Sequence, residues 1–295
     1  MTDCSEQEEL FYSSNSMEKL PDIMEINEYL IISKIGESKH SIVYFSKNMK
    51  TGEYFALKRI YLKSLYNEEA GILKLEKDIN SMREIKNENI IELHNVLHIE
   101  DLEYVFLVLD YADCGSLQHV IELGVLKINE IKYIFSMILK AICYLHNKGI
   151  VFHNIKPSNI LLCSDGRVLL ADCCFCNSIT NDTAYKAPEV LNESEFLNVE
   201  IEPSKEDVWS LGICLYQSLF GITPFNDKKS YHCPLVIPEG TNKEITELIN
   251  GMLCINPEKR MDINMIMNTD FFSNHEVINH FDFPIIKNDF VHNEN

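Results

Sequence analysis

The sequence predicts an α+β fold in two lobes, a small lobe built mainly from strands and a larger, mainly helical one. Between residues 30 and 109, short runs rich in β-branched and aromatic residues recur between turn residues, a pattern typical of strands. After residue 117, apolar residues follow the three-to-four spacing of helices. The stretch 111–115 fits neither pattern and is interpreted as the linker. A chain of 295 residues is long enough to bury a sizeable core in this arrangement.

Five strands and one helix are expected in the small lobe. The apolar runs predict strands over 30–32, 42–45, 54–57, 90–97 and 104–109. Residues 50–53 contain a Thr-Gly pair and suit a hairpin turn between the second and third strands. Between the third and fourth, Leu75, Ile79, Met82 and Ile85 follow a helical spacing, which predicts a helix over 73–85.

Four helices are expected in the larger lobe, over 117–123, 128–146, 208–220 and 245–253. The second of them is long and amphipathic, with Ile134, Ile138 and Ile142 on its apolar face. Between the second and third helices, Asp165 and Gly166 predict a hairpin turn, and a strand follows over 168–171.

Both ends of the chain differ from the region between them. Residues 1–25 are polar and acidic without periodicity, which predicts a flexible tail. Beyond residue 272 the chain is polar again, so 273–295 is interpreted as a second tail, in which Phe281, Phe283 and Phe290 are expected to be loosely packed. The small lobe is therefore expected to span 26–112 and the larger lobe 113–272.

Charge and composition exclude several classes of protein. A formal net charge of −19 argues against binding to nucleic acid or anionic membranes and is compatible with a basic protein partner or substrate. No apolar run approaches the ~18 residues that a membrane-spanning helix needs. The first ten residues are acidic rather than basic, unlike a signal peptide. We expect a cytoplasmic or nuclear protein whose ten cysteines stay reduced.

Several short motifs follow one another in a fixed order. They are Phe55-Ala56-Leu57-Lys58, Lys156-Pro157-Ser158-Asn159, Asp172 after a strand, Ala187-Pro188-Glu189, Asp207-Val208-Trp209-Ser210-Leu211-Gly212 and Asn256-Pro257-Glu258-Lys259-Arg260. Each motif is weak alone, but the ordered series over about 29–272 resembles a eukaryotic protein kinase of the Ser/Thr type. The run 235–239 resembles the calmodulin-dependent kinase kinase branch of that family.

The resemblance implies a two-lobed protein kinase fold, with a five-stranded antiparallel small lobe carrying one helix, and a site for ATP and Mg²⁺. Lys58 matches the lysine that holds the α- and β-phosphates, and counting back from Asn89 makes Asp78 its acidic partner. Asp is one methylene shorter than the usual Glu, which implies a looser pair. The residues implied to line the nucleotide site are Ile35, Gly36, Val43, Ala56, Lys58, Asp78, Leu109, Asp110 and Ala112.

Asp172 and Asn159 match the family's two metal ligands, and both carry the oxygens that Mg²⁺ prefers. The surroundings depart from the family pattern. In the glycine-rich loop only Gly36 remains, because Ser38 and Ser41 replace the other two glycines. The segment Asp172-Cys173-Cys174 lacks the usual Phe and Gly. We therefore expect ATP and Mg²⁺ to bind, but more weakly than in the family.

The proton-accepting Asp of the catalytic loop is replaced by Asn154. An amide orients a hydroxyl but cannot take its proton, and general-base catalysis contributes roughly 10²–10⁴-fold. Lys156 still matches the lysine near the γ-phosphate. Phe152 and Cys173 replace a His and a Phe that pack together in the family, an exchange that would conserve core volume. The arginine that reads activation-loop phosphate is His153.

Asp182 is a candidate replacement base, because alignment on Ala187-Pro188-Glu189 puts it where the family has a Thr that contacts the catalytic Asp. The alternative is an ordinary loop Asp in an Asn-Asp-Thr turn. Two functions therefore remain open. One is a pseudokinase that binds ATP and regulates or scaffolds a signalling partner. The other is a weakly active or rewired Ser/Thr kinase that transfers the γ-phosphate to protein hydroxyls.

Overall fold

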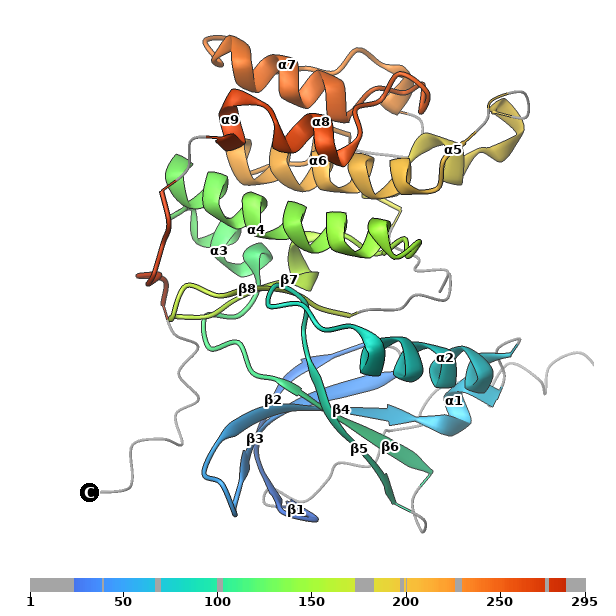
Figure 1. The fold of residues 1–295 in the computed structure, drawn as a ribbon, viewed down its shortest axis with the longest axis vertical. Helices are drawn as coiled ribbons and strands as arrows, with labels where there is room; N and C mark the ends of the chain where they lie inside the picture. Colours follow the sequence, from blue (N-terminus) through green and yellow to red (C-terminus); the bar gives the residue numbers. More distant parts are fainter. Residues whose placement is uncertain are drawn as a thin grey trace, which may run out of the picture.

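The computed structural model describes residues 24–38, 40–66, 70–99, 103–172, 183–196, 199, 201–225, 230–273 and 276–284. Two lobes are evident in Figure 1, with the sheet of the small lobe at the bottom and the helices of the larger lobe stacked above it. The α+β, two-lobed architecture predicted from the sequence is confirmed.

The small lobe is a six-stranded sheet in the order β1-β2-β3-β4-β6-β5, antiparallel throughout. Its strands are β1 (Met24–Ile26), β2 (Tyr29–Glu37), β3 (Ser41–Asn48), β4 (Tyr54–Tyr61), β5 (Leu93–Ile99) and β6 (Tyr104–Asp110). The five expected strands are present, and β1 is additional. Met24 pairs with Ile31 and Glu25 with Leu30. Residues 24 and 25, which were predicted to belong to the acidic tail, therefore lie in the sheet.

The sheet is apolar on both faces. Successive side chains of a strand point to opposite sides, so each strand contributes residues to both. Along β6, Val105, Leu107 and Leu109 join the main core, whereas Phe106 and Val108 join a second cluster with Leu57 on the other face. The main core continues from the sheet into the larger lobe. The small lobe is therefore fixed to the larger one through one face only.

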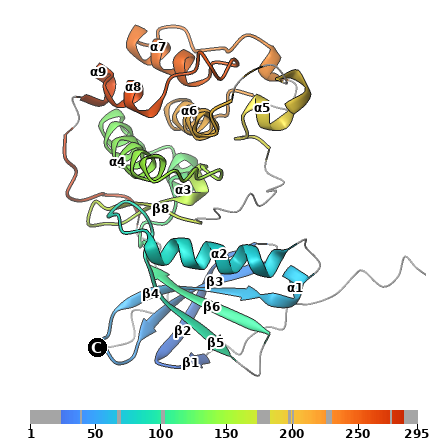
Figure 2. The same ribbon diagram turned by 45° about the vertical axis from the view of Figure 1, so that its right-hand side comes forward.

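Two helices accompany the sheet, α1 (Leu62–Tyr66) and α2 (Gly71–Glu84). The second corresponds to the helix expected over 73–85 and packs Ile79 and Met82 into the main core. Figure 2 shows α2 lying between the sheet and the larger lobe. The first helix has five residues, too few for a periodic pattern to predict it.

Within its described residues, the larger lobe contains the four expected helices and three short ones. They are α3 (Leu117–Leu123), α4 (Ile128–Asn147), α5 (Pro188–Leu191), α6 (Ser204–Phe220), α7 (Lys243–Met252), α8 (Ile263–Met267) and α9 (Asp270–Ser273). The strands β7 (Ile160–Leu162) and β8 (Val168–Leu170) form the expected hairpin at its base. Among the residues described, no helix is both long and apolar enough to cross a membrane.

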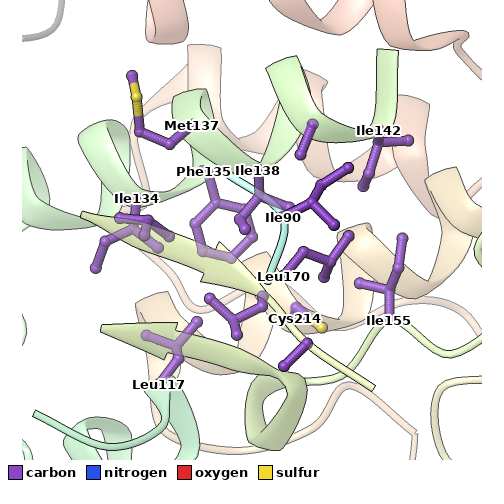
Figure 3. Close-up of a cluster of buried hydrophobic side chains, with 14 of the residues drawn as sticks. Ile90, Leu117, Ile134, Phe135, Met137, Ile138, Ile142, Ile155, Leu170 and Cys214 are labelled. Atoms are coloured by element: carbon purple, nitrogen blue, oxygen red, sulfur yellow. The ribbon is translucent and has the colours of Figure 1, made fainter. Parts of the chain in front are cut away.

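The core of the larger lobe forms where α4 crosses the β7–β8 hairpin. Figure 3 shows Ile134, Phe135 and Ile138 of α4 meeting Leu170 of β8, and all four are fully buried. Ile90 lies in the same cluster and bridges to Leu170, which explains why β5 begins at residue 93 rather than 90. This packing holds the loop before β7 and the segment after β8 against each other.

Part of the predicted C-terminal tail belongs to the larger lobe. Phe281 and Phe283 are 2% and 6% exposed and stack with ring centroids 4.9 Å apart. Phe281 also contacts the Tyr133 ring, and its backbone N–H donates to the Ser164 carbonyl. The expectation of loose packing is wrong for these two residues, because their rings bury apolar surface against α4. Phe290 lies outside the described residues.

Candidate active site

The loop between α4 and β7 runs over 148–159 and ends in a 3₁₀ turn, η1 (Pro157–Asn159). Asp207, near the start of α6, is fully buried and holds this loop. Its carboxylate accepts hydrogen bonds from the Phe152 and His153 backbone N–H groups, at 2.8 and 2.9 Å, and lies 2.8 Å from His146 Nε2. Asp207 therefore anchors this loop to α6.

Two sequence-predicted site residues, Lys58 and Asn154, contact Asp172. Lys58 Nζ on β4 lies 2.5 Å from Asp172 Oδ1, although 114 residues separate them along the chain. The Asn154 amide donates to the other carboxylate oxygen, with Nδ2 3.1 Å from Oδ2. Asn159 in turn donates to the Asn154 backbone carbonyl at 2.9 Å. Lys58, Asn154, Asn159 and Asp172 thus form one connected cluster between the lobes.

The backbone at this cluster is in an uncommon conformation. His153 and Asp172 have φ angles of 64° and 60°, in the left-handed region that side chains other than glycine rarely adopt. The surrounding hydrogen bonds hold both residues there. The positive charge of Lys58 is the main cause that keeps the pKa of Asp172 below its usual value, against the opposing effect of burial. The carboxylate is therefore ionised at neutral pH.

The predicted nucleotide-site residues of the sheet share one face. Val43 lies opposite Lys58 and Gly36 opposite Val43, while Ala56 lies opposite Leu109. Because residues two apart on a strand point to the same side, Val43, Ala56, Lys58 and Leu109 all face the larger lobe. Ala56 and Leu109 are buried and Ile35 is 38% exposed at the rim. These positions form an apolar wall beside the Lys58 ammonium group.

Asp110 and Asp78 were also predicted to line the nucleotide site, but their side chains are not part of this apolar wall. The Asp110 carboxylate turns to β5, where it accepts from the Glu92 N–H and lies 3.0 Å from His94 Nε2, so only its backbone belongs to the linker. Asp78 lies half-buried on α2. The ion pair recorded for Lys58 is with Asp172, and its predicted pairing with Asp78 stays a prediction. Ala112 follows in the linker and is half-buried.

The loop between β2 and β3 is closed by serine side chains. The Ser38 and Ser41 hydroxyls lie 2.8 Å apart, and the Ser38 N–H donates to the Ser41 carbonyl. His40 Nδ1 lies 3.0 Å from the Ser64 hydroxyl of α1. These contacts restrict a loop that glycines would leave flexible. They also attach the tip of the loop to the rest of the small lobe.

Some predictions fall outside the described residues, namely those on Asp182, Cys173 and Cys174. Phe152 is fully buried, as its place in the predicted core requires, but its exchange with Cys173 is untested. Lys156 lines a shallow hollow beside Asn154, together with Tyr185 and Lys186. The roles proposed for these residues remain predictions.

Sequence reasoning missed a buried charge network behind the loop. Glu206 is 7% exposed at the start of α6, and its carboxylate lies 2.8 Å from His153 Nδ1 and 3.0 Å from Lys186 Nζ. Lys186 also donates to the His153 backbone carbonyl at 2.9 Å. The sequence offered one clue to this network. Glu206 and Lys186 each directly precede a family motif, which begins at Asp207 and at Ala187 respectively. Glu206 and Lys186 together hold His153, the residue next to Asn154, in place.

This network predicts a pH dependence of stability. The hydrogen bond that the His153 ring donates to Glu206 raises the pKa of His153, against the opposing effects of burial and of Lys186, and the negative charges of Glu206 and Asp207 raise it further. A raised folded-state pKa stabilises the fold below the unfolded value of about 6.5, and this stabilisation is lost as pH rises through the folded value. We expect the loss of unfolding free energy caused by His153→Asn to be about 1–2 kcal/mol larger near pH ~6 than near pH ~9.

Urea unfolding at the two pH values measures this difference. The matched control is His98→Asn, because His98 is exposed on β5 and its replacement should change stability by less than about 0.5 kcal/mol. An equal effect of His153→Asn at both pH values would show that the ion pair with Glu206 contributes nothing to stability.

The residues predicted to hold Mg²⁺, Asn159 and Asp172, belong to the same hydrogen-bonded cluster. Both oxygens of Asp172 already accept N–H donors, from Lys58 and Asn154, and the Asn159 amide nitrogen is used on the Asn154 carbonyl. Among the described residues, no group of three or more His, Cys, Asp or Glu is placed to hold a metal ion. Mg²⁺ is usually held by one or two carboxylates besides phosphates. Asn159 Oδ1 and the remaining lone pairs of the Asp172 carboxylate are the groups that would ligate a cation, and the predicted Mg²⁺ site stays a prediction.

Comparison with known proteins agrees with the fold. A family profile described as "Protein kinase domain" matches residues 29–272. The chain is 30% identical over 260 residues to an Aurora kinase of Schizosaccharomyces pombe, covering 82% of this chain and 70% of that protein. It is 28% identical over 277 residues to the carbon catabolite-derepressing protein kinase of Candida glabrata, covering 88% and 44%. For CBL-interacting serine/threonine-protein kinase 12 of Arabidopsis thaliana the identity is 27% over 274 residues, covering 85% and 54%. The chain thus spans about half of the latter two proteins.

Proposed function

Because the chain belongs to the protein kinase family, of the Ser/Thr type, we propose that it is a pseudokinase that binds ATP and regulates or scaffolds a protein partner. One observation carries the proposal: Asn154 stands where the family has its proton acceptor, and its amide donates to Asp172. An amide in this position cannot accept the proton of an attacking hydroxyl. The loss expected from a missing general base is roughly 10²–10⁴-fold.

Binding of ATP is supported by the residues that remain. The apolar face with Val43, Ala56 and Leu109 suits an adenine ring, and the Lys58 ammonium beside it suits the phosphates. The Ser38–Ser41 contact stiffens the loop above the phosphates, which supports weaker binding than in the family. Nucleotide binding would then stabilise one arrangement of the lobes for a partner to recognise.

A second candidate function is a weakly active Ser/Thr kinase that phosphorylates protein hydroxyls. The retention of Lys58 and Asp172 side by side favours it, because the family uses the matching lysine to hold phosphates and the matching Asp to hold Mg²⁺. In this case Asn154 would orient the hydroxyl and Asp182 would accept its proton, while Lys156 would neutralise the γ-phosphate. The missing base at 154 makes this the less favoured function.

The partner we propose is a protein, and the net charge of −19 favours one with a basic surface over nucleic acid or an anionic membrane. We propose the cytoplasm or nucleus as its location. The likeness of 235–239 to the calmodulin-dependent kinase kinase branch stays a prediction.

A single-turnover experiment separates the two functions. Release of γ-phosphate from Mg·ATP is followed for the wild type and for Lys58→Met, with ATP binding measured by thermal shift on the same samples. We expect the wild-type release rate to equal that of Lys58→Met, while only the wild type gains thermal stability from ATP. Lys58 contributes a charged contact, and its loss should weaken ATP binding by about tenfold or more.

The matched control is Lys63→Met, which removes a surface ion pair with Glu103 on the same lobe and should bind ATP as the wild type does. Release by the wild type clearly above that of Lys58→Met would contradict the pseudokinase proposal and favour the second function. Asp182→Asn would then test the replacement base, since unchanged release in that variant would exclude it.

A further inference from the structure

We propose that the acidic segment that precedes β1 folds over one face of the small-lobe sheet, where the Glu18 carboxylate binds the buried guanidinium of Arg59. This is the face that carries the second hydrophobic cluster, opposite the main core. Lys58 and Arg59 are neighbours on β4 and therefore point to opposite faces. The inference is thus separate from the proposed nucleotide binding.

Arg59 is a buried cation that has no anionic partner among the described residues. It is 3% exposed, and its guanidinium carbon lies 4.7 Å from the centroid of the Tyr104 ring and 5.7 Å from that of the Tyr44 ring. Its enclosed Nη1 atom makes no hydrogen bond within the described part of the chain. The rings attract the cation but leave its N–H donors unpaired, and a buried charge without a partner is costly. A carboxylate that reached the guanidinium would remove this cost.

Two carboxylates of the small lobe lie near Arg59 but are already paired. Glu37 of β2 is in the same row of the sheet as Arg59, two strands away, and its side chain pairs with Lys34. Glu103 directly precedes β6 and lies 2.5 Å from the Lys63 ammonium. Neither is available to Arg59, so its anion has to come from another part of the chain or from a partner.

The face that carries the second cluster is concave. The Tyr29 side chain of β2 forms a hydrogen bond with the side chain of Asn95 of β5, although β3, β4 and β6 lie between these two strands in the sheet. The sheet therefore curls until β2 and β5 approach each other over the second cluster. A segment that continues along the β1 edge consequently faces β4 and β6 across the concave side.

The segment before β1 leads in the direction of Arg59. Because β1 is antiparallel to β2, going back along the chain from β1 follows β2 towards its Glu37 end. Ile26 lies opposite Tyr29, and the same register continued for eight residues puts Glu18 opposite Glu37, in the row of Arg59. Ile26 is buried in the second cluster, and side chains alternate along a strand, so Glu18 would face the same side.

A segment of the same chain is favoured over an acidic partner, because a short tether gives an effective concentration in the millimolar range. Residues 1–23 supply the charge, since one basic residue, Lys19, stands against Asp3, Glu6, Glu8, Glu9, Glu18 and Asp22. Once bound, the segment would hold β4 from the concave side. The acidic segment would then help to position Lys58, which the same strand carries on its other face.

A double-mutant cycle tests the contact in the full chain, with the melting temperature as the readout. We expect Glu18→Gln to lower the melting temperature by roughly 3–10 °C, because it weakens a charged contact to a buried group. In the Arg59→Met background the same change should shift it by less than about 1 °C, since the partner is gone. Glu6→Gln is the matched control, with the same loss of charge in the same segment, and should shift the melting temperature by less than about 1 °C in both backgrounds.

Equal effects of Glu18→Gln with and without Arg59 would overturn the proposal and leave the guanidinium for the anion of a partner protein. A rise in the wild-type melting temperature with inorganic phosphate that Arg59→Met abolishes would also overturn it, because the guanidinium would then be open to dissolved anions. If Arg59→Met fails to fold, hydrogen exchange decides. Backbone amides of residues 16–20 that are protected in the wild type but not in Glu18→Gln support the contact, and equal protection in the two proteins contradicts it.

Discussion

Glu189→Gln is expected to lower the free energy of unfolding by about 3–5 kcal/mol, because it leaves the buried charge of Arg260 without its partner. The Arg260 guanidinium is 1% exposed and binds the Glu189 carboxylate in a bidentate pair, at 2.6 and 2.8 Å. The same guanidinium donates to the Cys254 and Lys205 carbonyls, so it cannot turn towards water without losing those bonds too.

Thermal unfolding measures this effect. For a domain of this size, the expected loss corresponds to a fall in melting temperature of roughly 6–20 °C. The matched control is Glu247→Gln on α7, because the Lys243–Glu247 pair is 87% and 68% exposed. That variant should change stability by less than about 0.5 kcal/mol. Equal small losses in both variants would show that the buried pair adds nothing to the fold.

Phe281→Ala is expected to destabilise the fold by about 3–5 kcal/mol, as truncation of buried aromatic residues generally does. The ring is 2% exposed between Tyr133 and Phe283, and truncation leaves a cavity against α4. Close backbone contacts support the same segment, since a Cβ at Gly166 would lie 2.4 Å from the Ile278 carbonyl oxygen. The segment 276–284 therefore acts as part of the larger lobe.

Urea unfolding of Phe281→Ala compared with Val277→Ala tests this. Val277 lies in the same segment and is 71% exposed, so its truncation should have an effect within about 0.5 kcal/mol. A loss below about 1 kcal/mol for Phe281→Ala would mean that the segment is a dispensable tail, as the sequence analysis predicted.

Local patterns were sufficient to predict most of the elements. Helix α3 has the predicted bounds, and α4, α6 and α7 begin or end within four residues of theirs. Their periodicity, like that of the strands, is a property of neighbouring residues. The elements missed are short: β1 has three residues, α1 and α8 have five, and α5 and α9 have four. No local pattern distinguishes such pieces from loops.

The sequence by itself determined the family, the order of the lobes and the replacement of the proton acceptor by Asn154, because each is written in contiguous motifs. Only the tertiary structure decided what surrounds those motifs. It brought Lys58 to Asp172 across 114 residues, turned the Asn154 amide onto the same carboxylate, and placed Glu206 and Lys186 behind His153. It also packed Phe281 into the core. These contacts join distant residues, and they form only when burial of the shared core fixes the elements that carry them.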